Sequence, residues 1–283
     1  MRISFIFPAV LFALSAAVPC WGAITTLNLT TTGASATGTA DLGGTFQVDQ
    51  VGPQPTGTGY IDPFVRIQNG PNDERGYNTS LGTPLDDKSP SDGFTRALLL
   101  SEIPIITLGG IDYRQFLLDI NEDSGSDHEI LSLNQIQFFI ATSDQLHTGL
   151  TESTPTTPSS ITFGSATEIF RLSTNASADN FNEILLDYSL NSGSGSGDMF
   201  LYVQSSLFGT GDKNVIMYSH FGDDPDGSDI EGTGDSSSDG FEEWAVLQTG
   251  TPPPSVPEPA SLAIWGLGLG IAGIIGRRRM RRA

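Results

Sequence analysis

Short stretches of alternating hydrophobic and polar residues recur along most of the chain, and they predict β-strands. Phe46 and Val48, for example, alternate with Thr45, Gln47 and Asp49, as expected where successive side chains point to opposite faces. Twelve such stretches are separated by turn-forming residues. They lie at residues 45–49, 61–67, 94–100, 103–108, 113–120, 131–140, 161–163, 169–172, 184–188, 199–203, 215–220 and 244–247.

Many short strands joined by turns are typical of an all-β fold, an antiparallel β-sandwich or jelly roll. Residues 23–250 are long enough for one large sandwich or two small domains, and we expect one. The low-complexity Thr/Ser/Gly stretch at residues 30–40 is predicted to form a loose leader. The Thr/Pro/Ser-rich residues 150–160 are predicted to be a long exposed connection, and the Ser-Gly repeat at 191–197 is predicted to be a flexible loop.

The first residues predict a secretory signal peptide, assigned to residues 1–22. Arg2 supplies the positive start, an apolar run follows from Ile3 to Val18, and small residues allow cleavage after Ala17 or Gly22. Such a leader predicts that the rest of the chain is secreted.

The last residues predict a membrane segment of a different kind. Residues 251–255 form a Pro-rich spacer, residues 260–275 are apolar, and arginines fill most of 277–282. Sixteen helical residues span about 24 Å, which snorkelling arginines can extend across a bilayer. A basic end stays in the cytoplasm, so we expect a transmembrane helix with the body outside the inner membrane.

The order of these tail features resembles that of the PEP-CTERM proteins. The resemblance covers residues 256–283 and rests on the Pro-Glu-Pro triplet, the short Gly-rich apolar stretch and the arginine cluster. It implies a sorting signal at Val256, Pro257, Glu258, Pro259, Arg277, Arg278, Arg279, Arg281 and Arg282. It also implies an exosortase as partner, a transient stay in the inner membrane, and delivery to the cell surface or exopolysaccharide matrix.

Composition excludes several function classes for the body. The chain has 33 acidic and 13 basic side chains, a formal net charge of −20 and one cysteine. Nucleic-acid binding depends on Lys and Arg, so this partner is not expected. A single cysteine excludes a disulfide framework and Cys-rich metal sites.

Two acidic segments are candidate calcium sites, because calcium prefers several oxygen ligands on a turning loop. The strict EF-hand pattern fails, since Ser124 and Ile130 stand where Gly and Glu are needed. The alternative, and the more common case, is a solvated acidic loop that keeps a secreted protein soluble. The candidate ligands are Asp119, Asn121, Asp123, Asp127 and Glu129 in the first segment and Asp224, Asp226 and Asp229 in the second.

No catalytic residue is nominated, because the sequence has no P-loop, G-x-S-x-G or H-E-x-x-H motif. Glu242 and Glu243 would point to opposite faces of a strand. We therefore expect a structural, adhesive or carbohydrate-binding surface module and not an enzyme. The alternative is an extracellular polysaccharide hydrolase. Two carboxylates that face one cleft would favour this alternative.

Overall fold

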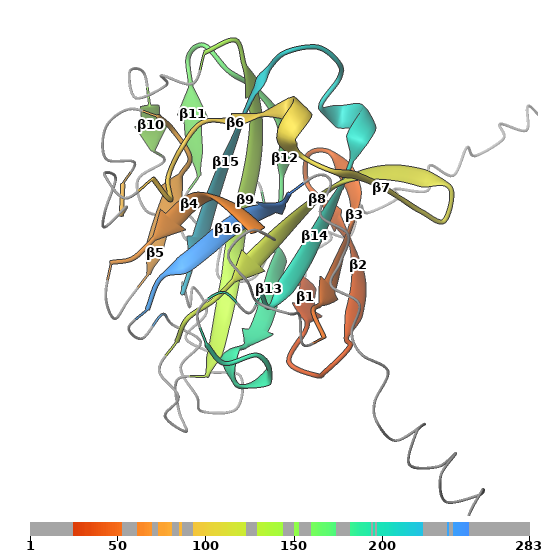
Figure 1. The fold of residues 1–283 in the computed structure, drawn as a ribbon, viewed down its shortest axis with the longest axis vertical. Coiled ribbons are helices and arrows are strands. Elements are labelled where there is room, and N and C mark those ends of the chain that lie inside the picture. The colour runs from red at the N-terminus through yellow and green to blue at the C-terminus, as the bar shows by residue number, and fades with distance from the viewer. Residues whose placement is uncertain are drawn as a thin grey trace, which may run out of the picture.

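Two seven-stranded β-sheets form most of the part of the chain that the structure, a computed structural model, describes (Figure 1). The signal peptide predicted at 1–22 and the sorting tail predicted at 256–283 lie outside it. The described residues are 25–52, 61–69, 73–80, 85–86, 93–122, 129–143, 150–152, 160–173, 182–193, 195, 197–222, 237 and 240–248.

The first sheet has the strand order β1-β13-β9-β15-β5, with β12 beside β9 and β6 beside β15. β1 runs parallel to β13, and the other described pairs of this sheet are antiparallel. The strands are β1 (Thr25–Asn28), β5 (Glu74–Tyr77), β6 (Leu98–Leu99), β9 (Ile130–Ala141), β12 (Thr167–Arg171), β13 (Asn182–Asp187) and β15 (Asn214–Phe221).

The second sheet has the order β2-β3-β14-β8-β16-β4, is antiparallel throughout, and carries β7 beside β8. Its strands are β2 (Ser35–Ala40), β3 (Gly44–Gln50), β4 (Ile61–Ile67), β7 (Ile105–Leu108), β8 (Ile111–Asp119), β14 (Met199–Gln204) and β16 (Glu242–Leu247). β10 (Leu150–Glu152) and β11 (Ile161–Phe163) form a separate pair. Three one-turn 3-10 helices lie at Leu100–Glu102, Tyr188–Leu190 and Ser205–Leu207.

The main hydrophobic core fills the space between the two sheets, as a sandwich requires. Phe116 of β8 and Phe138 of β9 meet across this space, with ring centroids 4.7 Å apart. Trp244 of β16 is fully buried, and its indole N–H donates to the hydroxyl of Ser219 on β15 at 3.1 Å. Burying each such aromatic side chain contributes about 1.5–3 kcal/mol. The expected all-β sandwich is confirmed for the described residues.

A smaller core lies on the outer face of the first sheet. Phe139 of β9 follows Phe138, and Tyr218 of β15 follows Met217; both preceding residues face the main core. The side chains of Phe139 and Tyr218 therefore point to the opposite face of the sheet. β11 covers them: the Phe163 ring lies 5.2 Å from the rings of both Phe139 and Tyr77. The period-two pattern therefore places apolar residues on both faces of this sheet.

The prediction of a loose leader at residues 30–40 is wrong from Ser35 onward. Ser35–Ala40 is β2 and pairs with β3 along its whole length. Its small residues are needed for packing, because a Cβ on Gly38 would lie 2.5 Å from the Phe46 ring. Low complexity here reflects this close approach and not a loose chain.

The strand predicted at residues 94–100 is also largely wrong. Only Leu98–Leu99 pairs with β15, and the chain then turns into a 3-10 helix. The carboxylate of Glu102 accepts from the amide of Leu99 at 2.6 Å, which caps this turn and ends the strand. The connection predicted at 150–160 contains β10 at its start. The described parts of 191–197 lie outside the strands as expected, but Asn191 is buried and its side chain donates to the carbonyls of Val51 and Gly197 at 2.6 and 2.9 Å.

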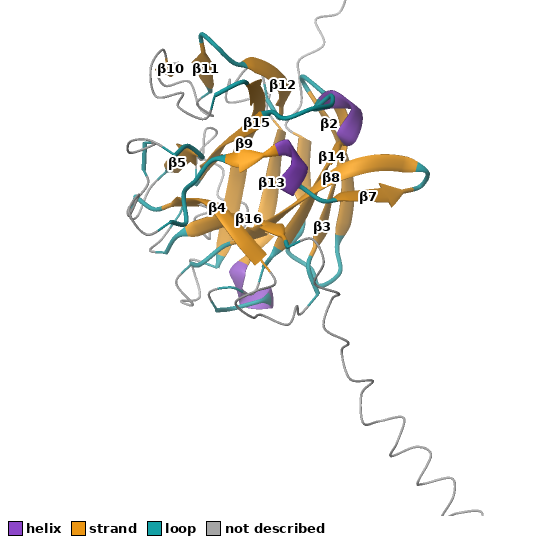
Figure 2. Cartoon of the chain, turned by 45° about the horizontal axis from the view of Figure 1, so that its top comes forward, coloured by secondary structure: helices purple, strands orange, loops and turns teal. Residues whose placement is uncertain are grey.

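The β7–β8 hairpin projects from the body in both views (Figures 1 and 2). Gly109 and Gly110, with φ of 59° and 84°, form its two-residue turn, a conformation that glycine adopts without strain. Ile105 and Ile111 on this hairpin are about half exposed. No described helix has the length and apolar character needed to cross a bilayer.

Candidate metal centre

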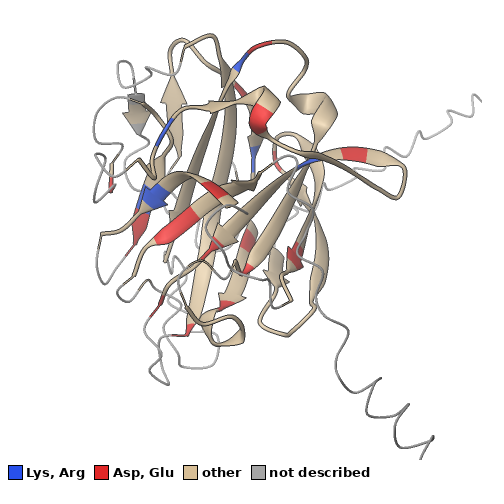
Figure 3. Cartoon of the chain, viewed as in Figure 1, with Lys and Arg blue, Asp and Glu red and all other residues tan. Residues whose placement is uncertain are grey.

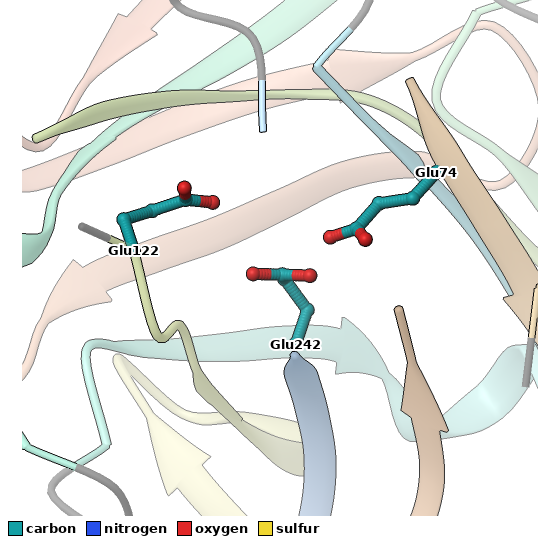
Figure 4. A group of neighbouring side chains, drawn as sticks. All are labelled: Glu74, Glu122 and Glu242. Carbon is teal, nitrogen blue, oxygen red and sulfur yellow. The ribbon is translucent and has the colours of Figure 1, made fainter. Parts of the chain in front are cut away.

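Three glutamates from separate segments converge at one end of the space between the sheets (Figure 4). Glu74 begins β5, Glu242 begins β16, and Glu122 follows the end of β8. One carboxylate oxygen from each lies within 4.8 Å of the other two. Glu74 and Glu242 are fully buried, and Glu122 is 4% exposed. We call these three residues the glutamate cluster.

Strand register aims two of these side chains inward from opposite sheets. Glu242 shares its face of β16 with Trp244, whose ring lies in the main core. Glu74 is paired with Phe221, another main-core residue, on the neighbouring strand β15. Residues directly opposite in an antiparallel pair share a face, so the two glutamates approach each other across the sandwich.

A close backbone contact brings Glu122 to the same place. A Cβ on Gly240 would lie 1.3 Å from the carbonyl oxygen of Asn121. Only glycine allows the chain entering β16 to pass so near the chain leaving β8. Because Glu122 and Glu242 follow these two positions, their carboxylates lie side by side.

The environment of Glu74 disfavours its charged form. Burial is the main cause that raises the pKa of Glu74 from its ordinary value to about 8, and the charges of Glu122 and Asp86 raise it further. The amide of Asn69, which donates to Glu74 at 3.0 Å, and the hydroxyl of Ser237 act in the opposite direction. These two donors do not overcome the desolvation.

The carboxylate of Glu242 has fewer hydrogen-bond donors than that of Glu74. Neither of its carboxylate oxygens has a hydrogen-bond partner among the residues that the structure describes, although the side chain is fully buried. Leaving a buried polar group unpaired costs about 1–3 kcal/mol, and more for a charged group. A carboxylate in this position needs a proton or a cation beside it.

The adjacent residue Glu243 has a different environment on the opposite face of β16. Its carboxylate accepts two bonds from the guanidinium of Arg66, at 2.9 and 2.6 Å. The rings of Phe94 and Phe241 lie over the same guanidinium, with their centroids 3.3 and 4.2 Å from its central carbon. The expectation that Glu242 and Glu243 point to opposite faces is thus confirmed.

Three of the five candidate ligands in the first predicted calcium segment are described. Asp119, the last residue of β8, accepts a hydrogen bond from the amide of Gly195. The side chain of Asn121 accepts from the hydroxyl of Tyr188 at 3.2 Å. Glu129 is half-buried, and its carbonyl accepts from the Tyr188 amide at 2.8 Å. The other candidate ligands, Asp123, Asp127, Asp224, Asp226 and Asp229, lie outside the described residues, and calcium binding by either segment stays a prediction.

Asp119 lies beside a second buried carboxylate, Asp198. One oxygen of Asp198 accepts from the amide of Ile120 at 2.8 Å. Burial raises the pKa of Asp198 to about 8, and the charges of Asp119 and Asp187 add to the effect. The chain that leaves β8 therefore has the pair Asp119 and Asp198 near it as well as the glutamate cluster. Lys and Arg residues are few across the described chain (Figure 3).

Sequence reasoning missed the glutamate cluster. Glu122 stands inside the first acidic segment, but it falls between the alternating positions chosen as ligands. Glu242 was singled out only as pointing to the strand face opposite Glu243. Glu74 has no signal in the sequence, because the pairing of β5 with β15 is what brings it to the site.

Comparison with protein families finds the PEP-CTERM protein-sorting motif at residues 255–282. This match confirms the resemblance of the tail and covers the Pro-Glu-Pro triplet and the arginines. It implies an exported protein that an exosortase recognises and sorts to an extracellular location. No curated protein and no solved structure matches the chain.

Proposed function

We propose that residues 23–250 form a structural or adhesive module that is displayed at the cell surface or in the exopolysaccharide matrix. The sorting motif at residues 255–282 is the observation that carries this proposal. In it, the signal peptide exports the chain, the apolar residues 260–275 hold it briefly in the inner membrane, and an exosortase releases the body near Pro257–Pro259. The tail is then the sorting signal, and the β-sandwich is the domain that reaches the surface.

The burial of the glutamates favours this module over the alternative polysaccharide hydrolase. A glycosidase needs two carboxylates that flank a bound sugar, about 5–9.5 Å apart, with access for water. Glu74 and Glu242 are fully buried between the sheets, where a glycan chain has no room. The one group of three convergent carboxylates among the described residues is therefore better suited to holding the fold together, and the neighbouring pair Asp119 and Asp198 is buried as well.

The positions of the aromatic residues favour a structural or adhesive role over carbohydrate binding. Sugar recognition uses exposed aromatic faces, but Tyr77, Tyr202, Tyr218 and Trp244 are all buried. The exposed apolar side chains of the described chain include instead Ile105 and Ile111 on the projecting hairpin. Such a hairpin is suited to contacts with other surface proteins.

Replacing Pro257, Glu258 and Pro259 together with alanine tests the sorting step. In a bacterium with an active exosortase, we expect the wild-type chain to lose its tail and to reach the surface, whereas the variant stays in the inner membrane with its tail attached. With an epitope label on the body, cell fractionation reports where the chain is located, and its mass reports whether the tail is still attached. A matched control replaces Pro252, Pro253 and Pro254, which precede the motif, and it should sort normally. Unchanged surface delivery of the triple variant would contradict the proposal.

Deleting the gene tests the role of the delivered body. We expect weaker cohesion of the surface matrix, measured by sedimentation of cells and retention of matrix protein, and restored by the wild-type chain. Release of reducing sugar when the purified chain is incubated with the host polysaccharide would instead support the hydrolase.

A further inference from the structure

We infer that Glu74, Glu122 and Glu242 together bind one calcium ion, which joins the two sheets of the sandwich. This site is distinct from the ligands predicted from the alternating acidic residues. It is also independent of the sorting proposal, because it concerns the body and not the tail.

The spacing of the carboxylates fits a single ion. Oxygens that bind one calcium ion at about 2.3–2.6 Å can lie up to about 5 Å apart. One oxygen from each glutamate falls within 4.8 Å of the others, and Figure 4 shows the three carboxyl groups turned toward a common centre. Three carboxylates offer up to six oxygens, which suits the high coordination number of calcium better than the smaller magnesium ion.

The state of Glu242 is the second and independent observation. It is fully buried, points into the cluster, and has no hydrogen-bond partner at either oxygen within the described chain. Its neighbour Glu243 shows how this sandwich treats a buried carboxylate that needs no added ion, by placing Arg66 at 2.6 Å from it. A divalent cation at the cluster would do for Glu242 what Arg66 does for Glu243.

The position of the cluster gives the ion a structural task. Glu74 belongs to the first sheet, and Glu242 to the second. Glu122 lies on the chain between β8 of the second sheet and β9 of the first. An ion bound by all three glutamates would join the two sheets at the end of the sandwich where acidic side chains replace the hydrophobic core. Because the ion binds only the assembled site, it stabilises the folded state by mass action.

The test measures calcium binding and thermal unfolding of the full chain, purified in detergent and freed of metal with a chelator. With calcium at 100 times its dissociation constant, we expect the Tm of the wild type to rise by about 5–10 °C. Magnesium at the same concentration should give a clearly smaller rise. Titration calorimetry with calcium chloride should give one ion per chain.

Glu242→Gln keeps the shape of the side chain and removes one ligand charge. We expect it to weaken calcium binding at least about tenfold, because affinity follows the number of charged ligands, while its unfolding without metal is at least as cooperative as that of the wild type. Glu74→Gln should behave the same way, and it serves if the first variant expresses poorly. The matched control is Glu243→Gln on the opposite face of the same strand, which should keep the calcium-dependent rise in Tm even where its baseline Tm falls.

Three results would overturn the assignment. The first is a wild-type Tm that does not respond to calcium. The second is a full calcium response in both Glu242→Gln and Glu74→Gln, which would place the ion elsewhere, for example at the acidic residues 223–229. The third is an equal response to magnesium, which would leave a divalent site that is not specific for calcium.

Discussion

The two faces of β16 treat neighbouring glutamates in opposite ways. On the outer face, Glu243 is held by Arg66, which is itself covered by the rings of Phe94 and Phe241. On the inner face, Glu242 meets two further carboxylates and no described hydrogen-bond donor. Both side chains are buried, so solvent compensates neither charge.

This difference separates two ways of stabilising a buried negative charge. The charge on Glu243 is compensated by a side chain of the same protein, although burial outweighs Arg66 and still raises the pKa of this carboxyl. The inner cluster depends on something that the surroundings supply, either protons or a cation. The outer pair should therefore be insensitive to added calcium or chelator, which change the inner cluster.

Breaking the outer pair should have the largest effect. Arg66→Ala leaves Glu243 buried without its cation, and we expect the free energy of unfolding to fall by about 3–5 kcal/mol. Urea denaturation should give this loss equally with calcium and with a chelator. A loss that appears only in one of the two conditions would mean that the two faces are coupled.

The double variant Arg66→Leu, Glu243→Leu is the control for this experiment. Replacing both partners of a buried ion pair with apolar residues is often close to neutral. We expect it to recover most of the stability that Arg66→Ala loses, and no recovery would mean that Arg66 acts mainly through its contacts with the two phenylalanines.

Changing pH should affect the inner cluster next most strongly, in metal-free protein. The pKa of Glu74 is about 8 in the fold and near 4.5 in the unfolded chain, so between these values the folded state holds a proton that the unfolded state lacks. The stabilisation that this proton contributes is fully present below pH 4.5 and is lost as the pH rises through 8. The free energy of unfolding should fall with a slope of at most about 1.4 kcal/mol per pH unit for this one proton.

Tm measured from pH 5 to 8.5 without metal checks this slope. Asp198, whose pKa is also about 8, contributes with the same sign. Glu74→Gln should therefore reduce the slope but not abolish it. A stability that rises with pH in metal-free wild-type protein would show that the cluster is not the dominant titrating group.

Removing one ring from the outer pair should have the smallest effect. The guanidinium carbon of Arg66 lies 3.3 Å from the centroid of the Phe94 ring, and Phe94→Leu keeps an apolar side chain there without the ring face. We expect a loss of about 0.5–2 kcal/mol, measured by urea denaturation. Phe241→Leu, with the ring at 4.2 Å, should lose less, and the reverse order would contradict the cation–π interpretation.

Alternation predicted the sandwich wherever one face of a strand is apolar. Strands such as β3 and β14 carry a regular apolar face and were found from the sequence. β2 and β5 were not. β2 packs with Gly38 and Ala40, which carry little hydrophobic signal, and β5 aims a glutamate inward where alternation expects an apolar residue. Both strands owe their structure to pairing with a neighbour and not to their own pattern.

The acidic site was predictable only in part, for a related reason. Local spacing marked the segment that contains Glu122, but it cannot show which carboxylates are buried. Burial depends on the register of β16 against β8 and of β5 against β15, which is set by contacts between residues far apart in the chain. The sequence therefore suggested acid-rich loops, whereas the structure brings together three glutamates at strand ends.

The place of β16 in the chain gives the glutamate cluster a mechanical meaning. β16 ends at Leu247, only a few residues before the Pro-rich spacer and the sorting tail, and it lies between β8 and β4. Tension applied through the tail, whether from the membrane or from an attachment that replaces it, would load this strand lengthwise against both neighbours. Glu242 stands at the far end of that strand. An ion fixing it to Glu74 and Glu122 would resist the pull at the point where the strand would otherwise slip free.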